Sequence, residues 1–208
     1  MPEVSALETL LKTSSLVWRG RGAEAVPTIS SGYEAIDLAL PGGGWPLGVV
    51  NELVPLADGI GELSLVLPAL QRAAAEPPIV LVSPPSIPLA PSLHRAGLPL
   101  KRLVWVEAAD DEDARWAAEQ ILREGVAAAA LIWTSAQGDL PLRRLQLAAQ
   151  GQSTLAFVYR PAATLRYPSP SAVRLALHPA AGALRIQVLR ARGGRDGASI
   201  LCPLHGRA

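Results

Sequence analysis

The feature that most constrains the fold is a regular alternation between two kinds of segment. Short apolar runs, rich in β-branched residues, alternate with longer stretches whose apolar residues recur at helical spacing. The strand-like runs cover 49–54, 79–83, 103–106, 127–133 and 154–159, and the helix-like stretches cover 62–75, 112–124 and 141–150. Such alternation is typical of a parallel sheet with helices on its faces. We therefore predict an α/β fold with a mainly parallel central sheet flanked by helices.

The pattern changes after residue 172. Three strand-like runs, "AVRLAL", "LRIQVLR" and "SILCPL", follow one another with only the short turns "HPAAGA" and "GGRDGA" between them. Strands joined by short turns pair in antiparallel fashion, because a parallel pair needs a long crossover. We therefore predict antiparallel C-terminal strands at one edge of the sheet.

The N-terminal region divides into two parts. The stretch "ALETLLKTSSLVW", 6–18, predicts a helix followed by an extended arm, and "RGRG" predicts a flexible link. The later segment "TISSGYEAIDLAL" predicts a helix with Ser30 or Ser31 as its N-cap. We therefore divide the chain into an N-terminal helix and interaction arm, 1–26, and a core, 27–208.

The arm carries an apolar tip, made of Leu16, Val17 and Trp18 and followed by Arg19. Such a tip suits docking on a neighbouring sheet or groove, and packing against the chain's own core is the alternative. If the tip docks outward, it can join copies of the chain into a homo-oligomer or hold another protein.

Composition and cysteine content indicate the class of protein. The 208 residues, 50% apolar and 18% charged, suffice for one sizeable core. A single cysteine forms no internal disulfide, and the N-terminus lacks the basic-then-apolar pattern of a signal peptide. The longest apolar run, "GVAAAALIW", is too short to span a bilayer. We expect a cytoplasmic protein without membrane segments.

The net charge of +1 conceals a strong asymmetry along the chain. Residues 1–142 carry 9 Lys/Arg against 17 Asp/Glu, a balance of −8, whereas residues 143–208 carry 10 Arg against one acid, a balance of +9. A segment this basic is expected to attract a polyanion or an acidic partner. The alternative is a solvated basic face that balances the acidic half.

The segment "LADGIGELSL" lies where a phosphate-binding loop is expected, between a strand-like run and a helix-like stretch. Such a loop, G-x-x-x-x-G-K-[ST], wraps phosphates with backbone N–H groups, counters their charge with Lys and holds Mg²⁺ through a hydroxyl. The corresponding positions are Leu56, Gly61, Glu62 and Leu63, with Gly59 inside the loop. A carboxylate in place of Lys turns an attraction of about 4 kcal/mol into a similar repulsion. We predict a degenerate loop that binds no nucleotide cofactor.

Glu62 has a structural explanation that needs no ligand. The start of a helix has unpaired N–H groups and a partial positive charge, and a carboxylate in the first turn satisfies both, for about 0.3–1 kcal/mol. An ATPase of this architecture also needs an Asp after its central strand, where Trp133 and Thr134 stand here. We therefore expect no catalytic activity.

Other catalytic patterns are weak. His94, His178 and His205 lack metal-ligand spacing, so we expect no metal site. The acidic run "DDED", 110–113, precedes a helix-like stretch and is predicted to cap it. Cys202 has only His205 nearby in the sequence as a catalytic partner.

Four segments, "PGGGWP", "IGELSLVLPAL", "ARWAAEQILREG" and "LRRLQLAAQ", together resemble the ImuA family, the RecA-like component of a bacterial SOS-induced mutagenesis cassette. The stretch "TISSGYEAIDLALPGGGWPLGVVNELV" is similar to the RecA segment that leads into its phosphate loop. The resemblance implies a RecA-like core and a role in translesion synthesis. The implied partners are ImuB, an inactive relative of Y-family polymerases, an error-prone DnaE-type polymerase assembly, and RecA itself.

The resemblance also assigns roles to individual positions. RecA's loop Lys and Thr correspond to Glu62 and Leu63, and its nucleotide-sensing Asn-Gln pair corresponds to Tyr159 and Arg160. The implication is that ATP switching is lost.

DNA contacts are implied in two segments. The loop "RPAATLRYPSPS" matches RecA's second DNA loop, and "RIQVLRAR" resembles its C-terminal strand with a basic pair, whereas the first DNA loop is shortened to "SAQGDLP". Guanidinium groups pair with phosphate and tyrosine stacks on bases, so weak, salt-sensitive DNA binding is expected. The candidate DNA contacts are Arg160, Arg166, Tyr167, Arg190, Arg192 and Arg195.

Two further functions remain open at the level of sequence. The SulA-like cell-division inhibitors share a degenerate RecA-like core and similar "IGELSL" segments, and they block FtsZ polymerisation. The third interpretation is a DNA-dependent ATPase with an unusual loop.

Overall fold

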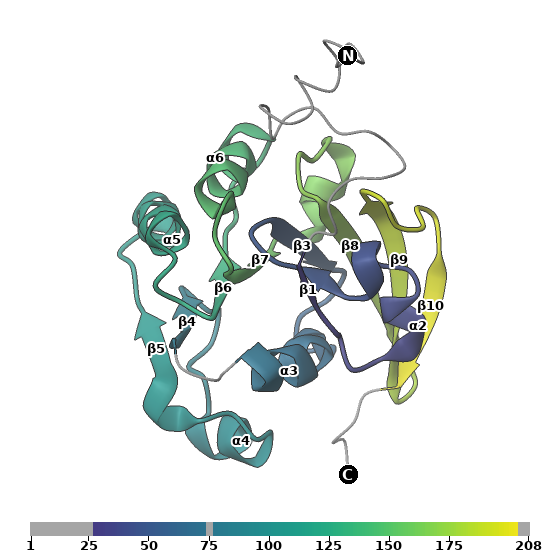
Figure 1. The fold of residues 1–208 in the computed structure, drawn as a ribbon, viewed down its shortest axis with the longest axis horizontal. Helices are drawn as coiled ribbons and strands as arrows, with labels where there is room; N and C mark the ends of the chain where they lie inside the picture. Colours follow the sequence, from purple (N-terminus) through teal and green to yellow (C-terminus); the bar gives the residue numbers. More distant parts are fainter. Residues whose placement is uncertain (1–26, 74–76, 204–208) are drawn as a thin grey trace, which may run out of the picture.

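One large sheet organises the computed structural model, which describes residues 27–73 and 77–203 (Figure 1). Its strand order is β10-β9-β8-β3-β7-β6-β4-β5. The strands are β3 (Val50–Pro55), β4 (Ile79–Val82), β5 (Leu103–Val106), β6 (Ala129–Trp133), β7 (Leu155–Tyr159), β8 (Val173–Ala180), β9 (Ala183–Ala191) and β10 (Ser199–Pro203).

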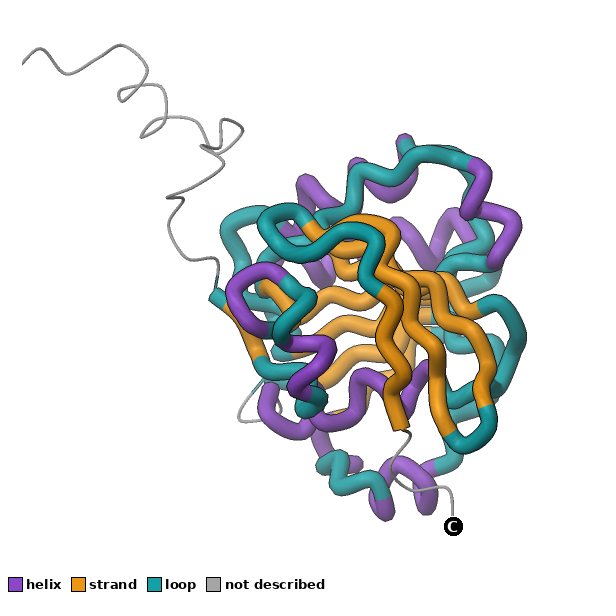
Figure 2. Tube along the Cα trace, turned by 90° about the vertical axis from the view of Figure 1, so that its right-hand side faces the viewer, coloured by secondary structure: helices purple, strands orange, loops and turns teal. Residues whose placement is uncertain are grey.

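The sheet is parallel from β8 to β5 and antiparallel only at its C-terminal edge. β3 lies between β7 and β8 and pairs in parallel with both, whereas β9 pairs antiparallel with β8 and β10 with β9. Figure 2 shows these last strands lying side by side at the front of the molecule. The predicted fold class, with its mainly parallel sheet and antiparallel edge, is confirmed.

One predicted turn is wrong in length. The segment "HPAAGA" was expected to connect two strands, but β8 continues to Ala180 and β9 already begins at Ala183. Gly182 has a φ of +65°, a conformation that glycine adopts freely and that a two-residue hairpin turn requires. The turn is therefore only two residues long.

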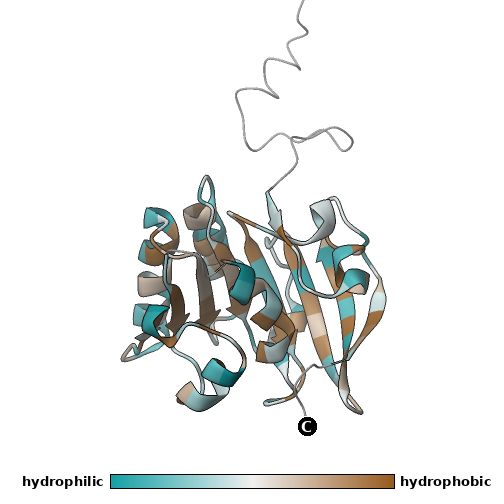
Figure 3. Ribbon diagram, turned by 60° about the horizontal axis from the view of Figure 1, so that its bottom comes forward, coloured by the Kyte–Doolittle hydropathy of each residue, from teal (hydrophilic) through white to brown (hydrophobic). Residues whose placement is uncertain are grey.

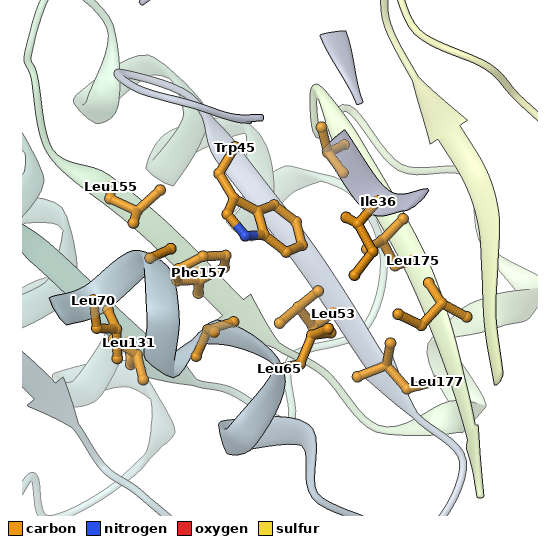
Figure 4. Close-up of a cluster of buried hydrophobic side chains, with 14 of the residues drawn as sticks. Ile36, Trp45, Leu53, Leu65, Leu70, Leu131, Leu155, Phe157, Leu175 and Leu177 are labelled. Atoms are coloured by element: carbon orange, nitrogen blue, oxygen red, sulfur yellow. The ribbon is translucent and has the colours of Figure 1, made fainter. Parts of the chain in front are cut away.

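Helices cover both faces of the sheet. α3 (Glu62–Ala73) packs on one face, and α5 (Asp111–Glu124) and α6 (Leu140–Ala149) pack on the other (Figure 1). The core on the α3 side includes Trp45, whose ring meets Phe157 edge-on with centroids 5.0 Å apart (Figure 4). The strands β4, β6 and β7 are made almost entirely of apolar residues, as a parallel sheet covered on both faces requires. The central strand β3 is the exception, because it carries the buried polar residues Asn51 and Glu52. In Figure 3 the C-terminal strands alternate between brown and teal.

The acidic run caps α5 as predicted. Asp110 takes the N-cap position and accepts hydrogen bonds from the backbone N–H groups of Glu112 and Asp113, each at 2.9 Å. Asp111, Glu112 and Asp113 then fill the first turn, where negative charge complements the helix dipole. Gly125, left-handed at φ 61°, ends the helix.

The predicted N-cap of the next helix upstream is wrong. α2 is only Glu34–Asp37 and has Tyr33 as its N-cap. The hydroxyl of Ser30 donates to Asp37 at 2.6 Å and the N–H of Ser31 donates to the same carboxylate at 2.7 Å. These hydrogen bonds to Asp37 hold both serines in a loop before the helix, so neither serine caps it. Ile36 in the helix and Leu40 beyond it are both buried.

The remaining elements are short, and two of them, β1 (Thr28–Ile29) and β2 (Trp45–Pro46), pair as a separate two-stranded antiparallel sheet. The others are α4 (Ala90–Arg95) and the 3₁₀ turns η1 (Pro41–Gly43), η2 (Leu100–Arg102) and η3 (Ala162–Arg166). The expected helix and arm, 1–26, lie outside the described residues. Among the helices that the structure describes, none has the length and apolar character needed to cross a membrane.

Candidate functional site

The loop after β3 is closed by its own glutamate. The backbone N–H of Gly61 donates to Glu62 Oε2 at 3.0 Å, and Glu62 begins α3. Gly59 and Gly61 have φ values of +65° and +101°, so both use a backbone conformation that favours glycine. Glu62 thus places a carboxylate at the helix start, where a phosphate would otherwise accept the N–H. The backbone N–H of Leu56 donates to the carbonyl of Leu177 at 2.9 Å, and the side chain of Leu63 packs against the core.

A cavity of about 380 Å³ opens at the carboxyl ends of β3, β4, β6 and β7, beside this loop. Its wall includes four carboxylates, so we call it the acidic cavity: Asp58, Glu62, Asp110 and Asp111. The carboxyl ends of parallel strands are where α/β folds bind ligands. The sign of the charge here is the opposite of that needed for a phosphorylated ligand.

Two of the four carboxylates are engaged in the fold. Asp110 caps α5. Asp111 forms an ion pair with Arg115 and accepts hydrogen bonds from Thr134 Oγ1 at 3.2 Å and from the N–H of Ser135 at 2.8 Å. Asp58 and Glu62 have no cationic partner among the described residues. These two carry the unbalanced charge of the cavity.

An aromatic pair forms one wall of the acidic cavity. Trp133 and Tyr159 stack with centroids 4.7 Å apart and ring planes 8° from parallel. Tyr159 is only 2% exposed, and its hydroxyl has no hydrogen-bond partner in the described part of the chain. Burial, and secondly the negative charge of Glu62, raise the pKa of Tyr159 well above its ordinary value. The phenol therefore stays neutral and lies close enough to Glu62 to sense its charge.

Ser83 adds a strained position to the same cavity. It follows β4 with φ +49°, the one positive φ among the described residues other than glycine. Its N–H donates to the Val106 carbonyl at 2.9 Å, but its hydroxyl is buried without a partner in the described ranges. Strained backbone and unsatisfied polar groups cluster at functional sites, because the surrounding structure must compensate for them.

A buried charge network centres on Glu52 of β3. Glu52 is fully buried, and its carboxylate lies 3.2 Å from Arg160 Nη1 and 3.2 Å from Arg174 Nε. It also accepts hydrogen bonds from the hydroxyls of Ser169 and Ser171, the latter at 3.0 Å. We call Glu52, Arg160, Arg174, Ser169 and Ser171 the Glu52 network.

The network holds two loops in place. Arg160 Nη2 donates to the carbonyls of Ala136 and Gly138, at 2.6 and 2.9 Å, which fixes the loop after β6. Arg174 donates to the carbonyls of Thr164 and Tyr167, at 2.8 and 2.9 Å, which fixes η3. Through these two arginines, both the loop "SAQGDLP" and the loop "RPAATLRYPSPS" are linked to the buried carboxylate of Glu52.

Arg160, expected as a DNA contact, has no free surface in this structure. Its side chain is 1% exposed, and its guanidinium is engaged by Glu52 and two carbonyls. The physical reason is that a buried carboxylate requires a buried cation. Arg160 positions the loops that flank it.

Three of the expected DNA contacts gather on one surface, which we call the arginine cluster: Arg166, Arg190 and Arg192. Arg190 donates to the Ser169 carbonyl at 2.5 Å and Arg192 to the Pro170 carbonyl at 3.0 Å. Arg166 lies over the Tyr167 ring, with Cζ 4.9 Å from its centroid. Burial, and secondly the charge of Arg190, lower the pKa of Arg192, as expected where two guanidinium groups lie close together.

The other two expected contacts are placed differently. Tyr167 is half-buried and, like Arg166, donates to Gln137 Oε1, at 3.1 Å. Its ring is covered on one side by Arg166. Arg195 lies in the turn after β9, where its N–H donates to the Ala39 carbonyl on the α2 side. The expected interface residues Leu16, Val17, Trp18 and Arg19 lie outside the described residues.

Sequence reasoning missed Glu52, the centre of the buried network. The available signal was a charged residue inside the apolar run "GVVNELV", since a carboxylate in a central strand needs a buried partner. The described ranges contain no group of three side chains suited to hold a metal ion. Cys202 is buried, which raises the pKa of its thiol to about 11 and leaves it protonated and unreactive at neutral pH.

No protein-family model matches the chain, and no curated protein matches it. The chain resembles SulA over half its length. The crystal structure of SulA from Pseudomonas aeruginosa is 26% identical, with a TM-score of 0.46, and the match covers 54% of this chain and 97% of SulA.

Proposed function

We propose that the chain is a non-catalytic, RecA-like adaptor of the SOS-induced translesion synthesis machinery. In this role it binds ImuB and brings a DnaE-type polymerase assembly to its partners, with RecA and DNA as further candidates. The observation that carries the proposal is the hydrogen bond from Gly61 N–H to Glu62 in the loop where a nucleotide phosphate would bind.

The acidic cavity is the reason for a non-catalytic role. A nucleoside triphosphate bound there would face Asp58 and Glu62. At about 4 Å and an effective dielectric constant near 20, each pair of like charges costs about 4 kcal/mol. Trp133 occupies the position of the acid that organises Mg²⁺ in a RecA-type ATPase. Both features argue against ATP turnover and support a non-catalytic role.

The arginine cluster supports the proposal that the adaptor binds an anionic partner. Arg166, Arg190 and Arg192 use part of their donors on oxygens of the chain, and Arg166 and Arg192 are exposed. Because Glu52 fixes the loops beneath them, these guanidinium groups are held in place before any partner arrives. Preorganised charge loses less entropy on binding. ImuB, RecA and the DnaE-type polymerase enter the proposal through the resemblance of the sequence motifs to the ImuA family.

The deciding experiment is a pull-down of purified ImuB and purified RecA, separately, with ATP present and absent. We expect the wild-type chain to capture ImuB equally in both conditions. A Trp18→Ala, Arg19→Ala double variant tests the arm, and Trp116→Ala, an exposed tryptophan on α5, is the matched control. Capture that requires ATP contradicts the proposal. No capture of ImuB together with inhibition of FtsZ assembly would instead favour a SulA-like inhibitor.

Calorimetric titration with ATP and Mg²⁺ gives a second, independent test. We expect no saturable heat with the wild-type chain. DNA-dependent ATP turnover that disappears in Gly61→Asp would restore the ATPase alternative.

A further inference from the structure

We propose that the acidic cavity is a receptor for the guanidinium group of an arginine side chain supplied by a partner protein. The inference deepens the proposed function, on which it rests, because it gives the chemistry of a partner group at the site that nucleotide would otherwise occupy.

The first step is the charge of the cavity. Asp58 and Glu62 lie in its wall without a cationic partner among the described residues, and Asp110 and Asp111 add negative charge behind them. Arg160 also reaches the wall, but its guanidinium is engaged by Glu52 and by the carbonyls of Ala136 and Gly138. Closely spaced like charges repel one another until a cation joins them. The ligand that suits this cavity is therefore a cation.

The second step is the unsatisfied polar groups of the cavity wall. Tyr159 lines the cavity and is more than nine-tenths buried, and its hydroxyl has no partner in the described part of the chain. The hydroxyl of Ser83 is likewise buried and unpaired among these residues. Both oxygens can accept hydrogen bonds, and an unpaired buried group is costly. A ligand with several N–H donors and no acceptor complements both oxygens as well as the carboxylates.

The third step is shape. Trp133 and Tyr159, whose rings stack on each other, both line the cavity, and its volume of about 380 Å³ admits a side chain rather than only an ion. A guanidinium is planar, carries five N–H donors and stacks on aromatic rings, whereas an ammonium is a compact point charge. The described residues also lack a metal-binding group of three side chains. Arginine therefore fits better than lysine or a divalent cation.

The test is a titration of the full-length chain with N-acetyl-arginine methylamide, followed through the indole N–H signals of ¹⁵N-labelled tryptophan. The Trp133 signal is assigned by its loss in Trp133→Phe. We expect a saturable shift of this signal, at least about tenfold weaker with the lysine analogue. N-acetyl-citrulline methylamide has nearly the same shape without the charge and should give no shift.

Variants locate the binding site. Asp58→Asn together with Glu62→Gln should abolish the shift, whereas Glu124→Gln, an exposed carboxylate at the end of α5, should leave it unchanged. Equal shifts with the citrulline and arginine analogues, or arginine binding that survives the double variant, would overturn the proposal. Saturation by spermidine at lower concentration than by the arginine analogue would overturn it in favour of a polyamine site.

The outcome is separable from that of the pull-down. Capture of ImuB without any arginine response would retain the adaptor and reject the receptor. Arginine binding without capture of ImuB would retain the receptor and reject that partner.

Discussion

The acidic cavity and the arginine cluster belong to the same fold but treat charge in opposite ways. In the cavity, Asp58 and Glu62 stand without a cation among the described residues, and the neighbouring oxygens of Ser83 and Tyr159 are unpaired there. In the cluster, Arg190 and Arg192 are anchored by backbone carbonyls, and Arg192 keeps exposed surface. Between them, the Glu52 network pairs its buried carboxylate with two buried guanidinium groups. The buried charges are thus engaged by partners within the fold, whereas the charges of the cavity and of the cluster remain available to the ligands that we propose.

Removing Glu52 should have the largest effect. Glu52→Ala leaves Arg160 and Arg174 buried without their counter-charge, and we expect the free energy of unfolding to fall by about 3–5 kcal/mol. Urea denaturation measures the loss. Glu124→Ala, on the exposed end of α5, should change stability by no more than about 0.5 kcal/mol. A loss below about 1 kcal/mol for Glu52→Ala would mean that the network does not hold the two regions together.

The arginine cluster should account for binding to DNA. Arg166→Ala with Arg192→Ala should weaken single-stranded DNA binding about tenfold at low salt, and lower the slope of log affinity against log salt by about 0.7 for each phosphate that is no longer neutralised. Fluorescence anisotropy over a salt series measures both effects. Arg185→Ala, exposed on β9, the strand that precedes Arg192, is the matched control. Equal effects in the control and the double variant would show only a general effect of net charge.

Tyr159→Phe should stabilise the free chain. The variant keeps the stack on Trp133 and removes a buried hydroxyl that has no partner among the described residues, so we expect a gain of about 1 kcal/mol in the free energy of unfolding. The same variant should weaken binding of N-acetyl-arginine methylamide. Thermal denaturation and the tryptophan titration measure the two effects. A drop in stability would show that the hydroxyl is satisfied in the folded protein and does not await a ligand.

The smallest effect is expected at Glu62. Glu62→Gln removes the charge at the start of α3, and stability should fall by about 0.3–1 kcal/mol at low ionic strength, less at high salt. Glu124→Gln removes a carboxylate from the last turn of α5, where negative charge opposes the helix dipole, so it should be neutral or slightly stabilising. Chemical denaturation at two salt concentrations compares them. Equal effects of the two variants on stability would contradict the stabilisation of the start of α3 by the charge of Glu62.

Local pattern was sufficient to predict most of the framework. The runs 79–83 and 103–106 became β4 and β5 almost to the residue, because short apolar runs bounded by polar and proline-rich turns predict strands whether they lie inside the sheet or at its edge. The acidic run before α5 was also predictable, since its capping bonds join residues two and three positions apart. In contrast, α4 carries a short, proline-containing sequence that has little helical periodicity.

The candidate site was only partly predictable, because its contacts join residues distant in the sequence. The carboxylate of Glu62 could be placed from its position at a helix start. The burial of Arg160 could not be predicted, because its partner Glu52 lies 108 positions away in the sequence. The basic segment that contains Arg160 also resembles an exposed segment. The stack of Trp133 on Tyr159 depends on the pairing of β6 with β7, which a single sequence does not reveal.

The position of β3 has a consequence for how the chain is made. β3 is an early strand at the centre of the sheet, but Val50 pairs with Ala156 and Asn51 with Val173, so both neighbouring strands are synthesised much later. At about 5–20 residues per second, β3 waits roughly 5–25 seconds on the ribosome before its neighbours exist. An apolar strand with unpaired edges is prone to aggregate during such a wait, and a charged residue within it reduces that tendency. We therefore expect the charge of Glu52 to reduce association of the nascent strand with other chains, in addition to its place at the buried centre of the finished fold.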